Sequence, residues 1–202
     1  MRSRLRTEPY LEGTYVREAW VNAAADRIRQ IAWLSPEAWK TMDIHQKAAS
    51  LNAAGRMLGE VYGVSAPPLL IEADEDRYAF GAYGDGYSFS ADRGAVEGAD
   101  YGIRMNTLAE VESKKLFGDD PLVALETYAH EFRHSYQAEQ LTRFRKPQFR
   151  GLVDDLTAVE SWDHEYVPPE QDFDAYQAQP VEKDARNFAQ ALVHRVYGRS
   201  YS

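Results

Sequence analysis

A five-residue sequence, H-E-F-R-H at residues 130–134, constrains this chain more than any other feature. It has the form H-E-x-x-H. In a helix, two histidines four residues apart lie on one face, so His130 and His134 can bind the same metal ion. Glu131 then lies beside the open side of that ion, where it can accept a proton from a metal-activated water molecule. The pattern therefore predicts a zinc site on a helix.

The third ligand of the predicted zinc site has to come from elsewhere in the chain. A catalytic zinc normally has three protein ligands and one open position, and a chain without cysteine offers only His, Asp or Glu. Glu182 lies in a helix predicted at residues 180–197, where it shares a face with an apolar stripe of Ala185, Ala189, Val193 and Val196. A carboxylate in such a stripe is costly to bury unless a cation lies beside it. We therefore expect Glu182 to be the third ligand.

Four other side chains are weaker candidates than Glu182 for the third ligand. Asp184 is about 200° away around the same helix, which predicts that it faces the opposite side. His164 lies in the polar sequence W-D-H-E-Y at residues 162–166, a segment that could fold over the cleft, and it is the alternative third ligand. His194, like His45 near the N-terminus, has no partner pattern and is expected to be structural.

A hydrogen-bond donor is also expected beside the metal, because the oxyanion that develops on a carbonyl needs stabilisation. Tyr176, just upstream of Glu182, is the candidate for this catalytic role, and Tyr166 is a weaker one. The chain has 13 tyrosines, and most of them are expected to pack in the core or on the surface.

The order of the predicted elements is that of an α+β protein with one domain over residues 1–202. In the helical N-terminal part, residues 1–65, one helix is predicted at 14–34, and the capping pair Asp43 and Gln46 opens another that ends at Gly63. The rest of the chain is predicted to form a small, mostly antiparallel sheet at 67–106, the motif helix at 121–141, an irregular, lid-like segment at 142–179 and the closing helix at 180–197.

Short strands are expected in the sheet, with Gly84-Asp85-Gly86 as a turn, at residues 69–71, 78–83, 87–89 and 101–106. In the last strand Ile103 and Met105 alternate with polar residues, so one face is predicted to be buried. We expect this strand at an exposed edge of the sheet, where a peptide substrate could add main-chain hydrogen bonds.

The charge and hydropathy of the chain argue against several kinds of partner. The net charge is −9 at pH 7, whereas nucleic-acid binders usually present a basic surface. No stretch approaches the roughly 20 apolar residues that span a bilayer, and no apolar segment follows the basic residues 1–6. We therefore expect a soluble protein without a signal peptide, either cytoplasmic or delivered by a specialised secretion system.

The motif helix and the sequence Q-P-V-E-K-D-A-R-N-F-A at residues 179–189 together resemble the ImmA/IrrE-type zinc metallopeptidases. Those proteins carry H-E-x-x-H on one helix and E-x-[DE]-A-x-x-F-A on a later one. The first glutamate of the second motif is their third ligand, as in gluzincins such as thermolysin. The resemblance covers residues 50–197 and implies a zincin-like fold, a Zn²⁺ cofactor and the ligand role of Glu182.

Two further features refine this resemblance. Residues 101–106 resemble the edge strand that precedes the active-site helix in that family. Related modules occur as processing peptidases or toxin domains in phage and bacterial secreted systems, and the spacing of Trp162, Tyr166 and Tyr176 is similar to theirs. The N-terminal fifty residues differ from the family's regulators, since they contain no helix-turn-helix.

The predicted function is the hydrolysis of peptide bonds by a metal-activated water, with His130, His134 and Glu182 as zinc ligands and Glu131 as general base. The expected partner is a peptide or protein substrate, with no nucleic acid and no membrane. Two alternatives remain open: a zinc amidase acting on a non-peptide or cell-wall amide, and a zincin-fold binding or regulatory module without catalysis.

Overall fold

The computed structural model describes residues 9–11, 14–72, 81–83, 102–106, 110–111, 114–164, 166–168 and 171–198. Helices dominate this part of the chain, and a small sheet makes the fold broadly α+β, as predicted. The α-helices are α2 (Glu18–Ile28), α3 (Pro36–Trp39), α4 (Ile44–Tyr62), α5 (Pro121–Arg145), α6 (Leu156–Trp162), α7 (Phe173–Ala178) and α8 (Pro180–Tyr197). Two 3₁₀-helices are η1 (Ala32–Leu34) and η2 (Pro147–Leu152).

Capping residues determine both ends of α4. The Asp43 carboxylate accepts a hydrogen bond from the backbone N–H of Gln46 at 2.9 Å, and the Gln46 side chain accepts one from the backbone N–H of Asp43 at 3.0 Å. Gly63, with φ of 62°, ends the helix in the left-handed region that glycine adopts without strain. The predicted start and end of this helix are confirmed.

The first helix is shorter than the predicted range of residues 14–34. α2 ends at Ile28, Ile31 has an extended backbone, and η1 then turns the buried Leu34 towards the core. Apolar residues three positions apart fit a helix, but they fit a turn followed by a 3₁₀-helix equally well. The periodicity was therefore compatible with both conformations.

The sheet differs from the mostly antiparallel sheet that was predicted. Its strand order is β1 (Leu69–Glu72), β3 (Ile103–Asn106), β2 (Gly81–Tyr83). β3 lies in the middle, pairs in parallel with β1 and pairs antiparallel with β2. Because β1 and β2 run in opposite directions on the two sides of β3, one of its two pairings is parallel. Sequence spacing does not reveal that β3 is inserted between two strands that precede it.

The central position of β3 also corrects the prediction that residues 101–106 form an edge strand. Ile103 and Met105 are fully buried, as predicted, and Asn106 on the other face is buried as well. A separate two-stranded antiparallel ladder joins β4 (Glu110–Val111) to β5 (Lys114–Lys115) and was not predicted. The turn at residues 84–86, the strand at 87–89, residues 78–80 and Tyr101 lie outside the described residues.

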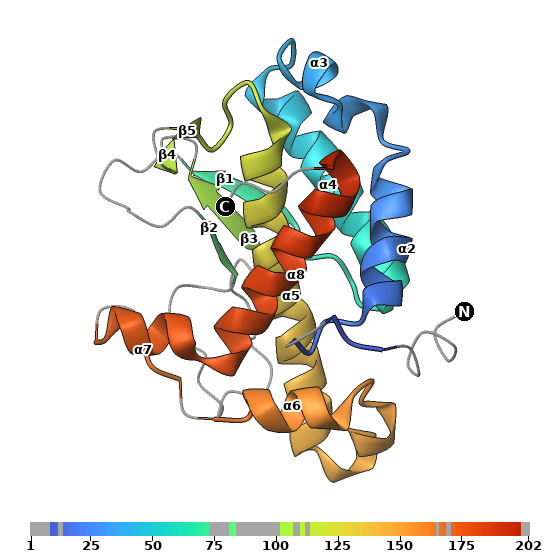
Figure 1. Ribbon diagram of the computed structural model, residues 1–202, viewed down its shortest axis with the longest axis vertical. Coiled ribbons are helices and arrows are strands. Elements are labelled where there is room, and N and C mark those ends of the chain that lie inside the picture. The colour runs from blue at the N-terminus through green and yellow to red at the C-terminus, as the bar shows by residue number, and fades with distance from the viewer. Residues whose placement is uncertain are drawn as a thin grey trace.

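The long helix α5 runs through the middle of the molecule, with the sheet on one side, α2 and α4 on the other, and α8 crossing it (Figure 1). Its predicted core residues, Leu125, Ala129, Phe132 and Tyr136, are all buried. Buried side chains continue around the helix, as expected for an element surrounded by others. A hydrophobic cluster of residues from α2, α4, β3, α5, α6 and α8 forms the core.

The segment predicted to be irregular, residues 142–179, contains the last turn of α5 and three short helices, η2, α6 and α7. α6 packs against α5 and α8, and α7 leads directly into α8 (Figure 1). The prediction of local helix in this segment is confirmed, while a lid function stays a prediction. Within the described ranges, no helix has the length and apolar composition needed to cross a membrane.

Candidate metal centre

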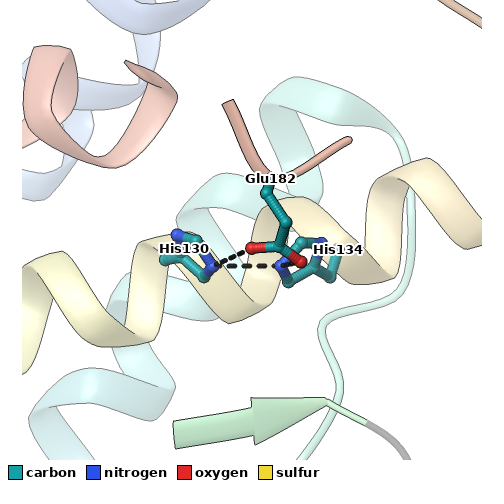
Figure 2. A group of neighbouring side chains, drawn as sticks. All are labelled: His130, His134 and Glu182. Carbon is teal, nitrogen blue, oxygen red and sulfur yellow. Dashed lines mark hydrogen bonds and ion pairs between the residues drawn. The ribbon is translucent and has the colours of Figure 1, made fainter. Parts of the chain in front are cut away.

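The middle of α5 presents the two histidines of the motif side by side. Both rings turn the same nitrogen towards the space above the helix, and the Nε2 atoms of His130 and His134 lie 3.0 Å apart (Figure 2). This arrangement follows from the four-residue spacing, which places the second histidine one turn along the same face.

Glu182 reaches these nitrogens from the first turn of α8 (Figure 2). Its Oε2 atom lies 3.4 Å from His130 Nε2, and its Oε1 atom lies 3.4 Å from His134 Nε2. In a tetrahedral zinc site with bonds of about 2.0–2.1 Å, neighbouring ligand atoms are about 3.3–3.4 Å apart. The two distances to Glu182 match this value, one to each carboxylate oxygen, and the 3.0 Å between the Nε2 atoms is slightly shorter, so the three side chains could hold one ion. The predicted grouping of the three residues is confirmed.

The three candidate ligands differ in how deeply they are buried and in the charge they carry. Glu182 is almost fully buried, with 4% of its side chain exposed, whereas His130 keeps 22% of its side chain exposed. Burial raises the pKa of Glu182, but the two imidazoles more than offset this, so that its pKa lies far below the usual value. The carboxylate is thus ionised in the core, and solvent reaches the group from the side of His130.

The pKa of His134 is shifted in the opposite direction, upwards. Burial alone would lower its pKa, but the Glu182 carboxylate raises it, and the net value is about 9. Without a metal, the imidazole therefore carries a proton that compensates the charge of Glu182. A divalent cation could replace this proton, since metal ligation requires the neutral ring.

Glu131 is buried beside the two histidines that flank it in the motif. Burial raises its pKa, the nearby His130 and His134 lower it, and Glu182 raises it, with a net increase. A carboxyl group with a raised pKa is suited to accept a proton and to return it. Glu131 thus lies close enough to the three candidate ligands for their charges to shift its pKa, and its role as general base stays a prediction.

Tyr176, the predicted hydrogen-bond donor, lies on α7 and is half-buried. Its pKa is raised well above the usual value, first by burial and then by the charge of Glu182, with smaller contributions from Tyr166 and Glu131. The ring of Tyr166 packs edge-on against Tyr176 at 6.2 Å between centroids. Both predicted tyrosines are thus gathered on the α7 side of the candidate centre.

The remaining histidines lie away from the centre. His164, the alternative third ligand, is exposed, as are His45 and His194. Within the described part of the chain, His130, His134 and Glu182 form the one group of potential ligands whose donor atoms could share an ion. The choice of Glu182 over His164 is therefore supported by geometry.

A layer of buried polar side chains lies behind the candidate ligands, whereas the sequence left open whether Arg133 and Gln137 orient neighbouring groups or face solvent. Gln137 Oε1 lies 2.8 Å from His134 Nδ1, and Gln137 Nε2 donates to Asp184 at 2.8 Å and to the Val181 carbonyl at 2.9 Å. Asp184 also accepts from Arg133 Nε at 2.8 Å and from Nη2 at 3.2 Å. These contacts connect α5 to the turn of α8 that carries Glu182.

Asp184 corrects the prediction that it faces away from the site, since it lies buried against α5 beside Arg133. α8 packs into α5 so closely that side chains on two of its faces reach the central helix. The i, i+4 pair Arg133 and Gln137, opposite an acidic residue two positions after Glu182, was the available signal in the sequence.

Comparisons of the chain with protein-family models, with curated proteins and with solved structures found no match.

Proposed function

We propose that this chain is a zinc-dependent metallopeptidase with a zincin-like fold, similar to the ImmA/IrrE type. The observation that carries the proposal is the donor group of His130, His134 and Glu182, with each Nε2 atom 3.4 Å from a carboxylate oxygen. Two imidazoles and one carboxylate, with no cysteine in the chain, are a donor set that suits Zn²⁺.

The chemistry follows from the side chains around this group. When bound, Zn²⁺ would act as a Lewis acid and lower the pKa of water at this point to near neutrality. Glu131 accepts a proton from the attacking water and passes it to the leaving amine as the peptide bond breaks. Tyr176, kept protonated by its raised pKa, donates a hydrogen bond to the oxyanion that develops on the carbonyl.

An extended peptide substrate would need a strand edge close to the centre. Since β3 is central, the predicted pairing with residues 101–106 is replaced by pairing with β2, which packs against α5 and is an edge of the sheet as far as the described residues extend. A peptide there would add main-chain hydrogen bonds along the side of the motif helix.

The first experiment is metal analysis combined with one catalytic substitution. Purified protein should contain about one zinc per chain, and Glu131→Gln should keep that zinc but lose peptide hydrolysis. Glu139→Gln is the matched control, because Glu139 lies on the same helix but pairs with Arg143 at the surface. This control should retain activity.

The outcomes distinguish the competing functions. Absence of zinc from a folded protein would contradict every catalytic version of the proposal. Zinc with equal function in Glu131→Gln would indicate a binding module. Turnover of peptidoglycan fragments but not of a peptide library would identify an amidase acting on a cell-wall amide.

A further inference from the structure

Four buried side chains form a continuous hydrogen-bonded line that ends at the candidate metal ligands. Arg133 contacts Asp184, Asp184 contacts Gln137, and Gln137 contacts His134. Arg133 and Asp184 keep 4% and 0% of their side chains exposed, and Gln137 is fully buried. Water therefore does not compete for these donors and acceptors, and each group has to satisfy its neighbour.

The direction of every hydrogen bond in this line is determined by its first member. A guanidinium can only donate, so Asp184 accepts from Arg133 as a carboxylate. The Gln137 amide meets two groups that can only accept, Asp184 Oδ2 and the Val181 carbonyl, so its NH₂ group must face them. The amide oxygen then faces His134 at 2.8 Å.

We propose that Gln137 is a positioning residue that holds the hydrogen of the neutral His134 ring on Nδ1, so that the Nε2 lone pair is directed at the metal. An amide oxygen cannot donate, so the His134 Nδ1 that faces it must be the donor. The remaining nitrogen, Nε2, is the one that lies 3.0 Å from His130 Nε2 and 3.4 Å from Glu182. This inference rests on the proposed zinc site.

The same glutamine positions the third ligand. Its NH₂ group contacts Val181 and Asp184, the residues one position before and two positions after Glu182. One side chain on α5 therefore fixes both the ring orientation of His134 and the turn of α8 that carries the carboxylate. Partners of this kind raise metal affinity by about 10- to 100-fold in other proteins.

Gln137→Leu removes both functions at similar volume, and Gln140→Leu is its matched control. Gln140 is also a fully buried glutamine on α5 that is hydrogen-bonded to a carboxylate, because it donates to Asp154 at 3.1 Å and accepts from the Asp154 backbone at 2.8 Å. These hydrogen bonds join it to Asp154 and not to a candidate ligand, so Gln140→Leu reports the general effect of losing a buried amide. Zn²⁺ and Co²⁺ affinity of the full chain is measured by competition with a chelator.

We expect Gln137→Leu to weaken metal binding by about 10- to 100-fold and to change the visible spectrum of the Co²⁺ form, whereas Gln140→Leu leaves both unchanged. A second measurement needs no variant. In zinc-loaded wild-type protein, long-range ¹H–¹⁵N spectra should show the His134 proton on Nδ1 and the metal on Nε2.

The positioning role is overturned if folded Gln137→Leu binds zinc within threefold of the wild type, or if both leucine variants lose affinity equally. Ligation of zinc through His134 Nδ1 would overturn it even if Gln137→Leu failed to fold. Wild-type protein that binds zinc as described but cleaves no peptide would contradict the proposed function alone. Wild-type protein that binds no zinc would overturn both.

Discussion

Replacement of Asp184 by alanine should destabilise the metal-free protein by about 3–5 kcal/mol, because it leaves the Arg133 guanidinium buried without a counter-charge. Asp184 supplies both oxygens that Arg133 contacts, and 4% of the Arg133 side chain is exposed. Gln137 keeps its bond to the Val181 carbonyl, so loss of its second acceptor adds only about 1 kcal/mol. The free energy of unfolding is measured by urea denaturation in the presence of EDTA.

Aromatic rings around Arg133 do not replace the lost carboxylate. The guanidinium carbon lies 4.6 Å from the ring centroid of Tyr136, and 5.4–5.6 Å from those of Trp162, Phe188 and Tyr62. A cation–π contact contributes about 0.5–2 kcal/mol, and these rings already make their contacts in the wild type. They therefore contribute equally to the wild type and the variant.

Two further variants distinguish the destabilisation caused by an unpaired buried charge from that caused by a general loss of packing. Asp163→Ala removes the partner of Arg145 at the surface, where both side chains are about one-third exposed, and should cost no more than about 1 kcal/mol. The double variant Arg133→Met with Asp184→Leu removes both charges and should be more stable than Asp184→Ala. A loss below about 1 kcal/mol for Asp184→Ala, or a double variant less stable than the single one, would refute the reasoning.

Two more predictions concern pH and packing. The pKa of His134 is about 9 in the folded, metal-free chain against an ordinary value of 6.5, so its protonation stabilises the fold fully below pH 6.5 and this stabilisation disappears as the pH rises through 9. The unfolding free energy in EDTA should fall across this window and the zinc-saturated protein should not show the same fall; a flat profile in EDTA would contradict the pairing with Glu182. Gly55→Ala should cost about 1–3 kcal/mol, since the added Cβ would lie 1.9 Å from the Tyr128 hydroxyl. That hydroxyl is buried and has no hydrogen-bond partner among the described residues, so Tyr128→Phe should be nearly neutral and should recover much of the loss in the double variant, as measured by thermal unfolding.

Local signals in the sequence predicted the two ends of α4 as well as the two helices, α5 and α8, that carry the candidate centre. The capping pair at Asp43 and the glycine at position 63 mark helix ends through contacts within a few residues. The choice of Glu182 depended on one carboxylate in an apolar stripe, which is also a local pattern. Such signals can be recognised in the sequence because the residues that form each pattern belong to one helix and lie within a few turns of each other.

The predictions that were wrong, and the features that were not predicted, depend on contacts between segments that are distant in the sequence. The insertion of β3 between β1 and β2 decides which strand is an edge, and strand alternation is the same at an edge and in the centre. Helical phase placed Asp184 opposite Glu182, but it could not show that α8 lies deep enough against α5 to bury both. The polar line through Gln137 needs two helices at a fixed distance, and no single segment encodes that distance.

The ligands of the candidate centre come from two helices that are separated along the chain by η2, α6 and α7. An ion held by His134 and Glu182 would link the two ends of this interval of about fifty residues. Because such an ion binds the folded chain and not the unfolded one, it would stabilise the fold by about 4 kcal/mol at a free-ion concentration about 1,000 times its dissociation constant. The metal would then anchor the whole intervening stretch at both ends. A cell could thereby distinguish loaded from empty molecules by how readily proteases open that stretch.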